Sequence, residues 1–202
     1  MHELKPLLTD LVGWCVQLVG IAWLLAAAYF AIRLPDTPWR RLLHFLRTLL
    51  PEPWLLPLLP VLFVVIRVTP PALWAHLRLW NPALAILGAA CVVAATALTL
   101  WARWTLGAMW AGRPLVQERH ELRTSGAYRI VRHPIYAGVA GLALGAMLVL
   151  GFGVMVVVAA FTLAFIAWRV WREERMLVAT FGDQYRAYRR RVPALVPFVR
   201  AA

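Results

Sequence analysis

The sequence predicts an all-α integral membrane protein, and three observations support this fold class. Hydrophobic residues make up 62% of the 202 residues and charged residues only 15%, whereas soluble domains carry about 25% charged residues. The apolar residues form runs long enough to cross a bilayer as helices, which takes about 20 residues. The basic residues lie at the ends of these runs, where arginine commonly meets the membrane surface. We therefore expect one compact membrane domain.

Neither a nucleic acid nor a metal ion is an expected partner. The formal net charge is +12, but the cations flank apolar runs and accompany no zinc-finger, helix-turn-helix or RNA-binding motif. Cys15 and Cys91 fall inside apolar runs without a CxxC pattern, which favours small buried side chains. No two histidines lie three or four residues apart, so a metal site is not expected.

The N-terminal half predicts three membrane spans and one helix on the membrane surface. The run 7–32 is too long, and its start too weakly basic, for a signal peptide, so we expect a retained span. Residues 39–50 form a short basic amphipathic pattern typical of an interfacial helix. Residues 53–68 predict a short second span interrupted by prolines, and residues 82–104 predict a third span.

The last apolar region, 135–168, contains no charged residue and predicts a helical hairpin. It is too long for one upright helix and just long enough for two short ones. The sequence LGFG at 150–153 supplies the turn. The chain is therefore expected to contain about five transmembrane helices.

The distribution of basic residues predicts an outward N-terminus and an inward C-terminus. With this orientation every basic residue lies on the inner side except Lys5, Arg67 and Arg78, as the positive-inside rule favours. A single helix in place of the hairpin would put the two largest basic clusters on opposite sides. The C-terminal helical tail then lies on the inner side, and we expect its helix to break at Gly182 and to stop before Val192 and Pro193.

The stretch GAYRIVRHPIYAG at 126–138 gathers polar residues directly before the hairpin. Pro134 suits the first turn of a helix, which puts His133 near the N-cap, where free N–H groups favour anions. Alternatively, His133, Tyr128 and Tyr136 are interfacial aromatic residues without a chemical role.

Two further features have both a structural and a ligand-binding interpretation. Glu173 and Glu174 follow the hairpin and either pair with Arg169 and other arginines or accept hydroxyl or ammonium groups of a ligand. The spacing of Gly138, Gly141 and Gly145 favours close helix packing. The first of these glycines also lies where a ligand could approach the backbone.

Two motifs lie on either side of the predicted hairpin. The first is HxLxxxGxYxxxRHPxYxG from His120 to Gly138, and the second is EExxLxxxFGxxYxxYxxxVPxxxPF from Glu173 to Phe198. Together they resemble the isoprenylcysteine carboxyl methyltransferase family and the related membrane phospholipid methyltransferases. The resemblance covers about residues 100–198. It divides the domain into N-terminal helices, 1–99, and a methyltransferase-like region, 100–202.

The resemblance implies an enzyme that uses S-adenosylmethionine as its methyl donor. The GxGxxG fingerprint of a Rossmann domain is absent from the sequence, so the cofactor is expected at the RHP segment and the tail instead. The resemblance also implies in-line methyl transfer at the inner membrane face. The acceptor would be a lipophilic or small thiol, carboxylate or amine, and Arg132 and Arg129 are the candidate catalytic residues. The implied cofactor-binding residues are His120, Leu122, Gly126, Tyr128, Arg132, His133, Pro134, Tyr136, Gly138, Glu173 and Glu174.

Two other functions stay open at this point. A membrane reductase of the steroid-reductase type would share a similar C-terminal helical layout and bind NADPH, although the paired glutamates favour methyl transfer. A non-catalytic carrier or assembly factor is the other alternative, but a carrier would more often show internal repeats with broken helices. Arginine replaces lysine almost everywhere, which suggests a GC-rich bacterial genome and a site facing the cytoplasm from the inner membrane.

Overall fold

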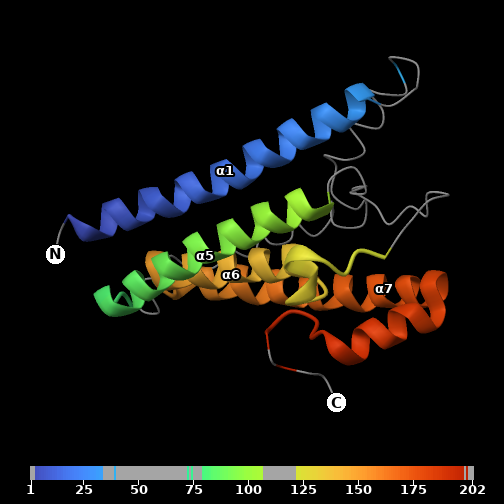
Figure 1. Cartoon of the computed structure of the whole chain (residues 1–202). Helices are drawn as coiled ribbons and strands as arrows, with labels where there is room; N and C mark the ends of the chain where they lie inside the picture. Colours follow the sequence, from blue (N-terminus) through green and yellow to red (C-terminus); the bar gives the residue numbers. More distant parts are fainter. Residues whose placement is uncertain are drawn as a thin grey trace.

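The computed structural model describes most of the chain outside two long segments, and its architecture is helical. The described residues are 3–33, 39, 72, 74, 79–106, 122–197 and 199. They form four α-helices, α1, α5, α6 and α7, and one turn of 3-10 helix, η3 (Figure 1). The all-helical fold class is therefore confirmed for this part of the chain.

Three of these helices are long and apolar enough to cross a membrane. They are α1 (Leu4–Arg33), α5 (Pro82–Leu106) and α7 (Gly153–Arg191). The fourth helix, α6 (Pro134–Leu150), is also apolar but has only 17 residues. The short helix η3 (Gly126–Arg129) precedes it. The helices support an integral membrane protein, while the number of five spans and their orientation stay predictions.

Most of the predicted helix boundaries agree closely with the structure. Helices α1 and α5 cover the predicted spans 7–32 and 82–104, and the hairpin turns at Gly151 and Phe152 between α6 and α7. The predicted surface helix 39–50, apart from Trp39, and the predicted span 53–68 lie outside the described residues.

Helix α5 is fixed at its start by two side chains that precede it. Asn81 Oδ1 accepts hydrogen bonds from the backbone N–H groups of Ala83 and Leu84, at 2.9 and 3.2 Å, as a helix N-cap does. The Trp80 indole N–H donates to the carbonyl of Val149 at 2.9 Å. The beginning of α5 is therefore held against the end of α6.

Helices α5 and α6 pack with their backbones in direct contact through glycine. A Cβ added to Gly88 would lie 2.7 Å from the Gly145 carbonyl oxygen, and a Cβ on Gly145 would lie 2.7 Å from the Gly88 oxygen. A Cβ on Gly141 would lie 2.9 Å from the Cβ of Ala95. Small residues permit this close approach in membrane helices. The packing interpretation of the glycine spacing accounts for these contacts.

The shared core lies at one end of the helices, where α1 meets α5 and α6. It consists of Leu8, Val12, Cys15, Ala85, Ala89, Val92, Ala146 and Val149. Further along α1, large apolar side chains such as Leu18, Ile21 and Leu25 are about half exposed or more. Exposed apolar side chains on a long apolar helix fit contact with lipid.

Helix α7 extends far beyond its apolar part. Its 39 residues would span about 58 Å as a straight helix, compared with about 30 Å for the hydrocarbon core. The charge-free portion ends at Trp168. Gly182 interrupts the helix with φ 52°, and the ribbon then turns back beneath the rest of α7 (Figure 1). The helix ends at Arg191, so the break and the stop occur where the glycine and the Val192–Pro193 pair predict them.

Candidate functional site

The segment before α6 is joined to the segment after α7 by backbone hydrogen bonds. The N–H of Arg132 donates to the Pro193 carbonyl at 2.8 Å, and the N–H of His133 donates to the Ala194 carbonyl at 3.0 Å. Pro134 occupies the first turn of α6, where its missing N–H costs no helical hydrogen bond. The two polar segments of the sequence therefore meet in one place.

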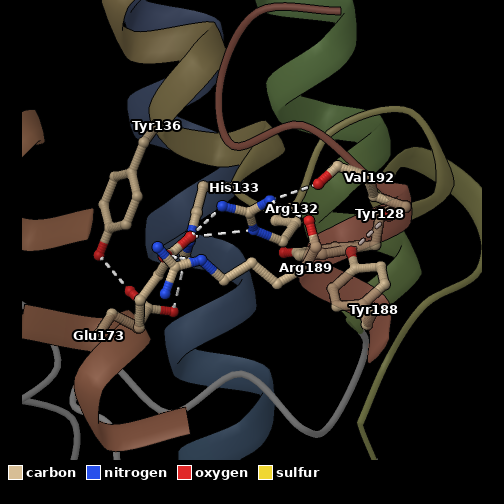
Figure 2. Close-up of polar contacts among 9 residues, drawn as sticks. Tyr128, Arg132, His133, Tyr136, Glu173, Tyr188, Arg189 and Val192 are labelled. Carbon is tan, nitrogen blue, oxygen red and sulfur yellow. Dashed lines mark hydrogen bonds and ion pairs between the residues drawn. The ribbon is translucent and has the colours of Figure 1, made fainter. Parts of the chain in front are cut away.

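Arg132 connects three parts of this site and is almost completely buried (Figure 2). Its Nε donates to Glu174 Oε1 at 2.9 Å, and Nη2 donates to the same oxygen. Its Nη1 donates to the Val192 carbonyl and, at 3.1 Å, to the Arg189 carbonyl. These carbonyls lie at the end of α7, where a helix lacks internal donors and favours a positive charge.

Glu174 is held as an anion by the groups around it. Its side chain is 12% exposed; besides Arg132, Oε1 lies 3.4 Å from His133 Nε2 and Oε2 lies 3.5 Å from Arg189 Nε. Burial alone raises the pKa of this carboxyl, but hydrogen bonds from His133 and Arg132 and the positive charge of Arg132 outweigh burial. The pKa of Glu174 is lowered to about 2 as a result.

Glu173 has a more open environment than its neighbour. Its side chain is 30% exposed. Oε2 accepts a hydrogen bond from the Tyr136 hydroxyl at 2.9 Å (Figure 2), and Oε1 lies 4.0 Å from His133 Nδ1. Arg169 Nε donates to the same tyrosine hydroxyl at 3.1 Å. Glu173 is therefore oriented by Tyr136 while part of its carboxylate faces outward.

The turn η3 is attached to both α5 and α7. Gly126 has φ 59°, a conformation that favours glycine, and a Cβ there would lie 2.8 Å from the Thr105 hydroxyl of α5. The Tyr188 hydroxyl donates to the Tyr128 carbonyl at 2.5 Å (Figure 2). Burial raises the pKa of the Tyr128 phenol well above its ordinary value, so this group stays neutral.

Nine of the predicted site residues fall into two groups in the structure. Arg132, His133, Tyr136, Glu173 and Glu174 form one connected cluster of side chains. Others support this cluster through the backbone or through packing, namely Gly126, Tyr128, Pro134 and Gly138.

Gly138 faces α5, because a Cβ at this position would overlap the Thr99 hydroxyl. Leu122 is partly buried and Arg129 is exposed on η3. His120 lies outside the described residues.

The structure adds contacts that the sequence motifs do not indicate. Arg189 contributes both a guanidinium and a backbone carbonyl, and the carbonyls of Val192, Pro193 and Ala194 hold the RHP segment. Backbone carbonyls leave no signal in a sequence, since every residue has one.

Comparison with known proteins identifies the same region of the chain. Residues 86–179 match the Isoprenylcysteine carboxyl methyltransferase (ICMT) family. Protein-S-isoprenylcysteine O-methyltransferase of Schizosaccharomyces pombe is 41% identical over 81 residues, 40% of this chain and 34% of that protein. Protein-S-isoprenylcysteine O-methyltransferase B of Arabidopsis thaliana is 39% identical over 84 residues, 41% of this chain and 43% of that protein.

A bacterial relative acts on a different acceptor according to its name. Methanethiol S-methyltransferase 1 of Bradyrhizobium diazoefficiens is 40% identical over 79 residues, 39% of this chain and 27% of that protein. The matched region spans less than half the length of each of these relatives. The resemblance carried by the sequence motifs is confirmed: residues 86–179 of this chain match the isoprenylcysteine carboxyl methyltransferase family, and relatives named as its methyltransferases are about 40% identical in this region.

Proposed function

We propose that this protein is an integral-membrane methyltransferase that uses S-adenosylmethionine and methylates a lipophilic or small acceptor. One observation carries the proposal. The RHP motif and the paired glutamates are separated by a whole helical hairpin, yet Arg132, His133, Glu173 and Glu174 are in direct contact. The same region matches methyltransferases that are named for transfer to oxygen and to sulfur.

The cluster offers a carboxylate suited to the cofactor. S-adenosylmethionine carries an ammonium group, a sulfonium centre and ribose hydroxyls, and when bound it supplies an electrophilic methyl group. Glu173 is the partly exposed carboxylate, with one close hydrogen bond from Tyr136 among the contacts described above. It therefore has acceptor capacity left for an ammonium or hydroxyl group. We assign Glu173 as the glutamate that contacts the cofactor.

Glu174 and Arg132 orient the site in this proposal. Four hydrogen bonds from Arg132 end on Glu174, Arg189 and Val192, and three donor atoms converge on Glu174 Oε1. Arg132 and Glu174 mainly form hydrogen bonds with each other and with neighbouring protein groups, which suits a rigid support better than direct ligand binding. Such support favours catalysis because methyl transfer depends mainly on alignment and exclusion of water.

The acceptor meets the site from the side of η3. Arg129 is exposed there, so its positive charge can attract an anionic carboxylate or thiolate. The names of the relatives include both an isoprenylcysteine O-methyltransferase and a methanethiol S-methyltransferase. A lipophilic or small acceptor with a thiol or a carboxylate is consistent with these two names. An amine is the third class of acceptor in the proposal. We place the site at the cytoplasmic face of a bacterial inner membrane.

Equilibrium binding of S-adenosylhomocysteine to detergent-purified protein tests this function. We expect micromolar binding that NADPH does not displace. Glu173→Gln removes the negative charge while keeping the size of the side chain, and should weaken binding roughly 10- to 100-fold, as loss of a charged hydrogen bond does. Isothermal titration calorimetry measures both affinities.

Asp183→Asn provides the matched control, because Asp183 lies on the same helix and its exposed side chain pairs with Arg186. This variant should bind like the original protein. If Glu173→Gln binds normally and Glu174→Gln does not, the roles of the two glutamates are exchanged. Displacement by NADPH favours the reductase alternative, and no binding by folded protein contradicts the proposal.

A further inference from the structure

A stripe of tryptophan and arginine lies on the outer side of α7, where the helix leaves its apolar part. Trp168, Trp171, Arg172 and Arg175 are spaced i, i+3, i+4 and i+7. At about 100° per residue they share one stripe roughly 100° wide. Glu173 and Glu174 point outside this stripe, at about 100° and 60° from its nearest members, so the stripe does not belong to the candidate site.

The aromatic rings and the guanidinium groups of the stripe are stacked in pairs. The guanidinium carbon of Arg172 lies 5.3 Å from the centre of the Trp168 ring, and that of Arg175 lies 4.7 Å from the centre of the Trp171 ring. Cation–π contacts of this kind hold a guanidinium over a ring face. A guanidinium carries several N–H donors in its plane, and their fork geometry suits a phosphate.

The stripe also lies at the level expected for lipid headgroups. Trp168 is the last residue of the charge-free region, and tryptophan is common at membrane interfaces. Trp171 is 56% exposed, and Arg172 and Arg175 are exposed as well. Two cations beside one exposed and one partly buried indole ring at the membrane surface complement an anionic headgroup with its acyl chains alongside.

We propose that Trp168, Trp171, Arg172 and Arg175 form a binding site for the phosphate of an anionic phospholipid. The lipid comes from the surrounding bilayer, and its acyl chains lie along the apolar part of α7. The site lies on the same turns of α7 as Glu173 and Glu174. It does not depend on the proposed enzyme activity, because it rests only on the surface of a membrane helix.

Lipid-dependent thermal stability tests the site in detergent-purified protein. Dimyristoylphosphatidylglycerol should raise the unfolding midpoint in a saturable manner, and dimyristoylphosphatidylcholine at equal concentration should raise it much less. The double variant Arg172→Gln/Arg175→Gln should bind the anionic lipid roughly tenfold or more weakly, since each arginine near an anionic surface contributes. Native mass spectrometry counts the bound lipids in parallel.

Arg186→Gln/Arg190→Gln is the matched control, because it removes the same charge from exposed positions beyond the Gly182 break. It should retain the lipid effect. Trp171→Leu removes a stacking partner without changing the charge and should also weaken binding.

Equal loss in the control double variant means that net charge alone attracts the lipid, and it overturns the proposal. The proposal also fails if inorganic phosphate stabilises the protein as well as the lipid does, or if Arg172→Gln/Arg175→Gln binds like the original protein. Circular dichroism and gel filtration establish that each variant is folded.

Discussion

At the scale of single residues, two adjacent glutamates have different environments. Glu174 receives hydrogen bonds from Arg132 and lies beside His133 and Arg189, whereas Glu173 is bound by Tyr136 and is more exposed. Adjacent positions on a helix point about 100° apart, so the two carboxylates meet different neighbours. The structure therefore separates a supporting carboxylate from an accessible one.

Replacing Glu174 should destabilise the protein in a pH-dependent manner. The pKa of this carboxyl lies near 2 in the folded protein, below its ordinary value of 4.5. The folded state therefore binds the proton less readily, and the stabilisation is present above about pH 5 and lost as the pH falls toward 2. Glu174→Gln should lower the unfolding midpoint at pH 7, with a difference from the original protein that shrinks toward pH 2.

Scanning fluorimetry in detergent between pH 7 and pH 2.5 measures this effect. Asp183→Asn serves as the control, because exposed substitutions usually change stability by less than about 0.5 kcal/mol. A stability difference for Glu174→Gln that stays constant down to pH 2.5 would contradict the assigned pKa.

At the scale of helices, the contact between α5 and α6 fixes the position of the RHP segment. Gly88 and Gly145 bring the two backbones together, and Thr99 lies against Gly138 one turn after Pro134. Trp80 holds the other end of the same contact. These contacts place the first turn of α6 against a long membrane helix without any contribution from the side chains of the site.

Gly145→Ala should destabilise the protein by about 1–3 kcal/mol. The new methyl group would lie 2.7 Å from both the Gly88 carbonyl oxygen and a Val92 methyl carbon, and such overpacking costs about this much. Gly20→Ala is the matched control, because nothing lies within 4 Å of a Cβ at this position of α1. Thermal unfolding in detergent compares the two; equal midpoints would contradict the close packing of α5 and α6.

The sequence predicts helices and their ends better than it predicts contacts between side chains. The hairpin follows from a charge-free run with a glycine turn, and Gly182 and Pro193 mark the break and the end of α7. The convergence of Arg132 with the glutamates follows from the family resemblance. The carbonyl acceptors near the end of α7 could not be predicted, because they belong to the backbone and depend on how the chain turns back after Gly182.

At the scale of the whole molecule, the arginines determine the expected orientation. The described basic residues concentrate near η3 and along α7 after Trp168, next to the candidate site. Positive residues near membrane helices favour the cytoplasmic side. The site and the lipid-binding stripe should therefore both face the inner leaflet.

Reporter fusions in a bacterial host test this orientation. Green fluorescent protein joined to the C-terminus should fluoresce, because it folds in the cytoplasm, and alkaline phosphatase joined there should be inactive. A reporter at the N-terminus should give the opposite result if five spans are present. Reporters that place both ends on one side would contradict an odd number of spans.

The hydrogen bonds from Arg132 and His133 to Pro193 and Ala194 also determine how late in synthesis the candidate site can form. These partners are about sixty residues apart in the chain, and contacts of long sequence separation form late. The RHP segment leaves the ribosome before Pro193 and Ala194 are synthesised. During this time Arg132 lies in or beside the membrane without these hydrogen-bond acceptors. Until synthesis has passed Ala194, the two hydrogen bonds that join the start of α6 to the segment after α7 cannot form.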